Sequence, residues 1–127
     1  LGNLLAGTNG YLDWNLLLDE LGGPNHVKNY CAAPMMCDTT KGTVEKRLSY
    51  YYIGHFSRYI RRGAVRLATT RFTDKIEAVA FENPDGSRVT VLMNRTGEDI
   101  WLSLREGEEG ISFVVKAHSI MTVLHEK

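Results

Sequence analysis

The stretch IEAVAFENPDGSRVTVLMNR, residues 76–95, decides the fold of this chain. Two apolar runs of strand length, 76–83 and 88–95, flank the segment 84–87, which reads Pro-Asp-Gly-Ser. Proline presets φ and glycine reaches positive φ at no steric cost, so this segment is a strong turn signal. The stretch therefore predicts an antiparallel β-hairpin.

Further short strands are expected on both sides of this hairpin. They cover residues 65–72, 100–105, 111–116 and 120–125. In the segment 100–105, three aliphatic side chains alternate with three residues of other types, as a sheet with one buried face requires. Ile100, Leu102 and Leu104 should face inward, and Trp101, Ser103 and Arg105 outward. The segment 106–110 (EGEEG) predicts a solvated hairpin tip. The second half is thus predicted to be an antiparallel sandwich or small barrel.

The chain changes character near Gly63. Before it, apolar side chains recur at helical spacing over residues 48–60, and Gly63 suits the position that ends a helix. Residues 4–18 read as a buried strand that runs into a loop, and residues 20–29 as a shaped loop containing Gly-Gly-Pro-Asn. We expect one domain over residues 1–62 and another over 63–127.

Composition restricts the functional classes. The 127 residues contain 15 basic and 15 acidic side chains, so no net field attracts nucleic acid or an anionic membrane. No apolar run approaches the roughly 18 residues of a spanning helix. A chain of this length is too short for a complete (β/α)8 barrel of about 250 residues. Cys31 and Cys37 are separated by five residues, which favours free thiols over a zinc site or a disulfide.

Three collinear motifs, residues 10–16 (GYLDWNL), 22–25 (GGPN) and 52–60 (YIGHFSRYI), resemble the C-terminal third of glycoside hydrolase family 30, in particular its glucosylceramidases. The resemblance continues through residues 78–87 and 89–95 in one register. It implies a mainly β fragment, in which the last β/α unit of a TIM barrel precedes an antiparallel β-sandwich. It also implies a retaining β-glycosidase whose two glutamates lie about 5 Å apart on earlier strands. We therefore expect no catalytic residue, cofactor or metal in this chain.

The resemblance also implies the binding residues. Trp14 matches an aromatic that lines the sugar subsite, although Trp14 beside two leucines would otherwise read as core. Asn29 matches an amide that reaches a substrate hydroxyl, with a loop-capping Asn as the alternative. Asp13 is expected to point away from the Trp14 ring and to support it. His26 departs from the tryptophan of many relatives, which leaves the aglycone preference open.

Three other features have structural explanations as readily as functional ones. The carboxylates Asp13, Asp19, Glu20 and Asp38 could be nominated as a substitute catalytic pair, but they belong to one strand and its loop. His55 on the predicted helix should be a packed, hydrogen-bonded residue. Residues 94–96 (NRT) form a glycosylation sequon that a strand-end turn explains equally well.

Two further readings stay open. The chain could be a stand-alone β-sandwich that binds carbohydrate or protein without catalysis, for which Trp101 is the one tryptophan available after Gly63. Alternatively, an apolar strand and helix without their neighbours could pair with a second copy. The family resemblance suggests a secreted, periplasmic or lysosomal protein acting on a β-glycoside. The opening residues, with no initiator methionine or leader pattern, suggest a domain boundary.

Overall fold

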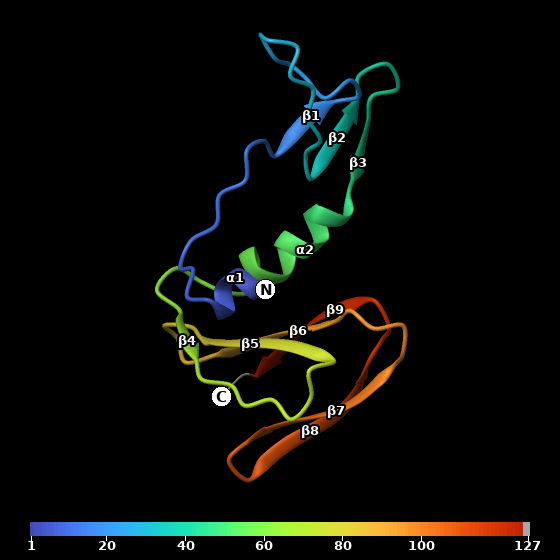
Figure 1. Cartoon of the computed structure of the whole chain (residues 1–127). Helices are drawn as coiled ribbons and strands as arrows, with labels where there is room; N and C mark the ends of the chain where they lie inside the picture. Colours follow the sequence, from blue (N-terminus) through green and yellow to red (C-terminus); the bar gives the residue numbers. More distant parts are fainter. Residues whose placement is uncertain (126–127) are drawn as a thin grey trace. The chain divides into compact units, whose positions relative to one another are not determined.

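The computed structural model describes residues 1–125, which are mainly β (Figure 1). The elements are α1 Gly2–Leu5, β1 Leu17–Asp19, β2 Met35–Asp38, β3 Thr43–Lys46, α2 Leu48–Ser57, β4 Val65–Leu67, β5 Ile76–Glu82, β6 Arg88–Asn94, β7 Ile100–Glu106, β8 Glu109–Val115 and β9 Ser119–His125. The chain forms two compact units. The first contains residues 1–8 and the chain from His55 onward, and the second contains residues 9–54.

A four-stranded antiparallel sheet in the order β4-β5-β6-β9 is the centre of the first unit. Strands β5 and β6 form the predicted hairpin, with Val79 opposite Val91. Its turn is closed by a hydrogen bond from the Asn83 N–H to the Ser87 carbonyl oxygen at 2.9 Å, and Gly86 has φ +81°. The prediction for residues 76–95 is confirmed.

Both faces of this sheet are covered, because alternate residues of β5 and β6 point to opposite sides. On one side Val79 and Val91 lie in a cluster with α1 and the segment that ends α2. On the other side Ile76 and Leu92 pack with Val115 of β8. Burial on both faces explains why β6 is an almost continuous apolar run rather than an alternating one.

Strands β7 and β8 form a separate two-stranded hairpin that covers the second side of the sheet. The predicted alternation along β7 is confirmed, since Ile100, Leu102 and Leu104 are half-buried and the residues between them are exposed. The tip turns at Gly107, whose φ is +59°. The outer face of this hairpin is therefore open to solvent.

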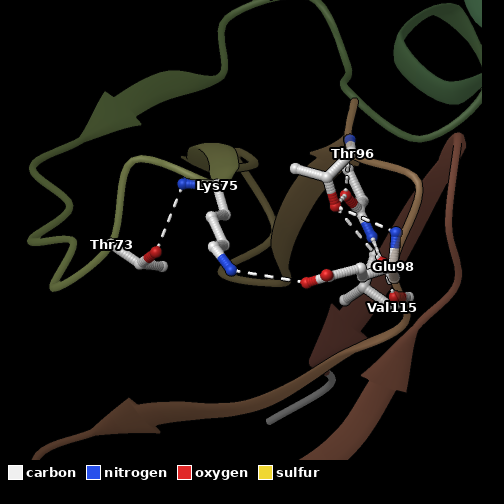
Figure 2. A network of polar contacts seen from close by, with 6 residues as sticks. Thr73, Lys75, Thr96, Glu98 and Val115 are labelled. Carbon is white, nitrogen blue, oxygen red and sulfur yellow. Dashed lines mark hydrogen bonds and ion pairs between the residues drawn. The ribbon is translucent and has the colours of Figure 1, made fainter.

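Asn94, at the end of β6, joins the sheet to the hairpin. Its side chain is 1% exposed, and its amide donates to the carbonyl oxygens of Glu98, Val115 and Lys116 at 2.8, 3.2 and 3.0 Å. Its carbonyl oxygen accepts from the N–H and hydroxyl of Thr96. Figure 2 shows Thr96, Glu98 and Val115 gathered in this network, with Lys75 reaching Glu98 from the preceding loop. The sequon is thus explained by a strand-end turn.

Three sequence-based expectations for residues 4–72 need correction. Residues 4–18 do not form the expected buried strand running into a loop: Leu4 and Leu5 end α1 and pack with Leu1 on the sheet, residues 6–16 are irregular, and only Leu17 and Leu18 lie in a strand. Helix α2 ends at Ser57 rather than at residue 60, so Gly63, with φ +89°, lies beyond the helix end. Strand β4 covers only Val65–Leu67 of the expected 65–72.

The second unit contains a three-stranded sheet in the order β1-β2-β3. Strand β1 runs parallel to β2, whereas β2 and β3 form an antiparallel pair. Its small core consists of Leu18, Ala33 and Met36, with Cys31 against it. Strands β2 and β3 were not identified from the sequence; in β2, Met35-Met36-Cys37-Asp38 has no β-branched residue that favours a strand. The irregular segments around this sheet carry the candidate site residues.

Candidate functional site

Trp14 lies in the irregular segment between α1 and β1, and 87% of its surface is exposed. Within the described residues Trp14 is therefore not part of a core, although its leucine neighbours would favour one. The backbone N–H of Trp14 donates a hydrogen bond to the Asp13 carboxylate at 2.9 Å, which fixes the backbone at this point. The backbone of Trp14 is therefore fixed and the face of its indole ring is exposed, as stacking on a sugar requires.

Asp13 does not lie on a strand, so the expectation that strand alternation turns it away from the Trp14 ring rests on the wrong element. Its carboxylate accepts the Trp14 N–H and the Tyr11 hydroxyl, the latter at 3.4 Å. Both bonds are local. Asp13 thus shapes the segment that carries Trp14. Its support of Trp14 in sugar binding stays a prediction.

Asn29 is exposed in the loop between β1 and β2. Its backbone carbonyl oxygen accepts a weak bond from the Cys31 thiol at 3.6 Å. Within residues 1–125 its side-chain amide makes no hydrogen bond, so the loop-capping alternative has no support there. An unengaged amide can both donate to and accept from a sugar hydroxyl.

Asp19 and Gly22 hold the loop that leads to Asn29. This role was not predicted from the sequence for either residue. The Asp19 carboxylate accepts from the N–H groups of Leu21 and Gly23 at 3.0 and 2.7 Å. Gly22 has φ +83°, and its carbonyl oxygen accepts from the Cys31 N–H at 3.1 Å. A β-carbon at Gly22 would lie 2.9 Å from the Cys31 nitrogen and closer still to its carbonyl oxygen. This close approach requires glycine.

Glu20 and Asp38 are also engaged locally. Glu20 accepts from the Thr39 N–H and hydroxyl, and these bonds lower the pKa of its carboxyl group. Bonds from the side chains of Lys41 and Thr40 lower the pKa of Asp38. A general acid needs the opposite shift, toward a raised pKa. Neither group is therefore suited to protonate a leaving group.

A groove of about 310 Å³ lies beside these two carboxylates. Its lining residues are Glu20, Met36, Cys37, Asp38, Lys41, Thr43, Glu45 and Arg47. Neither Trp14 nor Asn29 contributes to it. The groove is lined mainly by charged side chains, without the aromatic face that binds a neutral sugar.

His55 behaves as expected. Its Nδ1 lies 2.8 Å from the Thr122 hydroxyl of β9, so it is a packed and hydrogen-bonded residue. Burial lowers the pKa of its imidazole. Within the part of the chain that the structure describes, no three His, Cys, Asp or Glu side chains form a metal-binding group. Cys31 and Cys37 are free thiols.

His26 is exposed in the same loop as Asn29. Its imidazole shares this loop with the exposed apolar side chains of Leu21, Val27 and Tyr30. None of the helices in residues 1–125 has both the length and the apolar character needed to cross a membrane.

Comparison with known proteins relates both parts of the chain to one family. The Glycosyl hydrolase family 30 TIM-barrel domain matches residues 1–60, and the family's beta sandwich domain matches residues 63–123. The mouse lysosomal acid glucosylceramidase is 40% identical over 125 residues, which is 96% of this chain and 24% of that protein. The chain thus spans about a quarter of the length of this relative.

Two solved structures have the same fold over nearly the whole chain. SrfJ from Salmonella typhimurium superimposes with a TM-score of 0.93 at 37% identity, covering 99% of this chain and 28% of SrfJ. The endo-β1,6-glucanase BT3312 superimposes with a TM-score of 0.92 at 30% identity, covering 99% of this chain and 29% of that enzyme. The expected arrangement, a barrel remnant followed by a β-sandwich, is confirmed.

Proposed function

Because the chain belongs to glycoside hydrolase family 30, we propose that it forms the C-terminal part of a retaining β-glycosidase that hydrolyses β-glucosidic bonds. The proposal rests on one observation: an aromatic side chain of this chain is free to contact a ligand, whereas its candidate catalytic carboxylates are engaged in hydrogen bonds. Trp14 presents an open ring, whereas the carboxylates of Asp13 and Glu20 are occupied by local hydrogen bonds. The chain is thus equipped to hold a sugar and not to cleave it.

Retaining hydrolysis needs two opposed carboxyl groups about 5 Å apart, one as nucleophile and one as acid and base. Asp13 and Asp19 each hold backbone N–H groups of their own loop. Hydrogen bonds lower the pKa values of Glu20 and Asp38, which is the opposite of the shift that a general acid needs. We therefore assign the catalytic pair to a part of the enzyme outside these 127 residues.

Trp14 and Asn29 are the proposed sugar contacts. The indole face would pack on the C–H face of the glucose ring, and the Asn29 amide would bond a hydroxyl. Asp13 would support Trp14 through the 2.9 Å bond to its backbone N–H. The family domain matches end at residue 60 and resume at residue 63, which supports the proposed boundary at Gly63 between barrel and sandwich.

The substrate class follows from the relatives. A glucosylceramidase and an endo-β1,6-glucanase are both similar to this chain, so β-glucosides are the shared substrate class that we propose. With His26 in place of a broad aromatic ring, we expect a weakened preference for a lipid aglycone. The lysosomal relative supports a lysosomal or secreted location for the protein.

The test is a substitution series in the longer enzyme to which we assign this chain, with p-nitrophenyl β-glucoside as substrate. Trp14→Ala and Asn29→Ala should each lower kcat/KM by about tenfold or more, because each removes a sugar contact. Phe72→Ala is the matched control, since Phe72 is 98% exposed and lies outside the proposed site. Unchanged kinetics in both site variants would refute the assignment.

A further inference from the structure

The outer face of the hairpin β7–β8 carries a strip of side chains that the proposed function does not use. Its centre is Trp101, which is 76% exposed and lies opposite Val114. Along the same face follow the pairs Ser103 with Ser112 and Arg105 with Gly110. We refer to these six residues as the outer strip. The inward-facing residues Ile100, Leu102, Phe113 and Val115 pack in the sandwich core, whereas no residue of the outer strip does.

The polar groups of the outer strip follow one another along the hairpin. The hydroxyls of Ser103 and Ser112 lie 2.7 Å apart and form one donor and acceptor pair. A β-carbon at Gly110 would lie 3.0 Å from Cγ of Arg105, which shows that the Arg105 side chain lies across the glycine. Successive outward residues of a strand are about 7 Å apart. The strip thus presents an aromatic face, then hydroxyls, then a guanidinium.

The charges next to Trp101 are neutralised. Lys116 and Asp99 form an ion pair of 2.6 Å at the end of the hairpin away from its tip, and the same pair lowers the pKa of Asp99. Only the guanidinium of Arg105 adds charge to the strip. A polyanion such as nucleic acid needs several unpaired cations, and this surface does not offer them.

A stable protein partner is also a poor fit. Protein interfaces bury roughly 800 Å² on each side around a core of several apolar side chains. The outer strip has one large exposed apolar side chain, and polar groups follow it directly. A ligand that alternates flat C–H faces with hydroxyl groups matches this pattern, and a β-linked glucan chain is such a ligand.

We propose that the outer strip is an accessory binding site for a neutral β-glucan chain, with Trp101 stacking on one sugar and the Ser103–Ser112 pair bonding its neighbour. The choice of a glucan as ligand rests on the proposed function, whereas the location rests on the hairpin alone. Such a site would hold a polymeric substrate away from the residues that contact the cleaved sugar. Neither Trp14 nor Asn29 takes part in it.

The site can be tested on the full chain by two-dimensional ¹H–¹⁵N NMR with gentiotetraose, a β-1,6-linked glucose tetramer. The chain has two tryptophans, and hence two indole N–H signals, which Trp101→Phe assigns. We expect the Trp101 signal to shift saturably. Trp101→Ala should weaken binding about tenfold, and the double variant Ser103→Ala/Ser112→Ala should weaken it several-fold. Phe72→Ala, a control on the same unit, should bind as the unchanged chain does.

The outcomes separate this site from the proposed sugar subsite. If only the Trp14 signal moves, the subsite is supported and the outer strip is refuted. If only the Trp101 signal moves, the outer strip is supported without help from the subsite. If the Trp101 signal instead shifts with chain concentration in the absence of sugar, the strip is a contact between copies and the proposal is overturned.

Discussion

The side-chain amide of Asn94 donates a hydrogen bond to the backbone carbonyl oxygen of Val115 over 3.2 Å, across the junction between the two sheets of the first unit. Both side chains are buried, and the same amide also serves the carbonyl oxygens of Glu98 and Lys116. Asn94, which lies in a glycosylation sequon, thus connects the two sheets through its hydrogen bonds. Its amide nitrogen has no room for a glycan in the folded chain.

Asn94→Ala should lower the free energy of unfolding by about 2–4 kcal/mol, because the buried carbonyl oxygen of Val115 and the part-buried ones of Glu98 and Lys116 lose their donor and a cavity remains. Chemical denaturation followed by far-ultraviolet circular dichroism measures this change, because both tryptophans are already exposed in the folded chain. Asn25→Ala is the control, since Asn25 is exposed and should change stability by less than about 0.5 kcal/mol. Equal stability of the two variants would contradict the role assigned to Asn94.

Gly22→Ala should destabilise the loop that carries Asn29 by about 1–3 kcal/mol. The reasons are the positive φ of Gly22 and the closeness of the Cys31 backbone. Hydrogen exchange should accelerate at the N–H groups of Gly23 and Cys31, which are bonded in this loop. Gly10→Ala, where a β-carbon meets nothing within 4 Å, should leave exchange unchanged. Protection that survives in Gly22→Ala would refute the close-packing explanation.

His55 should make stability fall as the pH is lowered from about 7.5 to about 5.5. Burial holds the pKa of His55 below the ordinary 6.5, so the unfolded chain binds this proton more readily than the folded chain. The contribution is present above pH 6.5 and is lost as the pH falls through the folded pKa. The variant His55→Gln should flatten the slope, and the exposed-loop control His26→Gln should not. An unchanged slope in His55→Gln would count against this account.

Arg88 should couple the sheet to the tip of the β7–β8 hairpin. Its guanidinium contacts Glu82 at 2.9 Å and also pairs with Glu106. A double-mutant cycle with Arg88→Met and Glu106→Gln should give a coupling of about 0.5–1 kcal/mol that declines with salt. The Lys75–Glu98 pair is more exposed and should give a coupling close to zero. A smaller value for Arg88 than for Lys75 would contradict the expectation.

The hairpins were predictable because their signals are local. The turn at Gly86 and the alternation from Ile100 to Leu104 are written in adjacent residues. Helix α1 was not predictable, since four residues form a helix only where tertiary packing holds them. Leu1, Leu4 and Leu5 gain that support from a sheet whose strands begin about sixty residues later.

The candidate site was accessible from the sequence only through family resemblance. Trp14 and Asn29 lie in irregular segments, and contact with a sugar imposes no period on the chain. Local reasoning favoured Trp14 as core, yet its ring is exposed. The pairing of Asp19 with the Gly23 N–H depends on a backbone geometry that residue types alone do not specify.

The central claim is that this chain contributes sugar contacts to a hydrolase while the cleaving groups lie elsewhere. Incubating the purified chain alone with p-nitrophenyl β-glucoside tests it most directly. We predict release of p-nitrophenol at the rate of the enzyme-free blank. Turnover well above that rate, abolished by Asp13→Asn or Glu20→Gln, would contradict the claim.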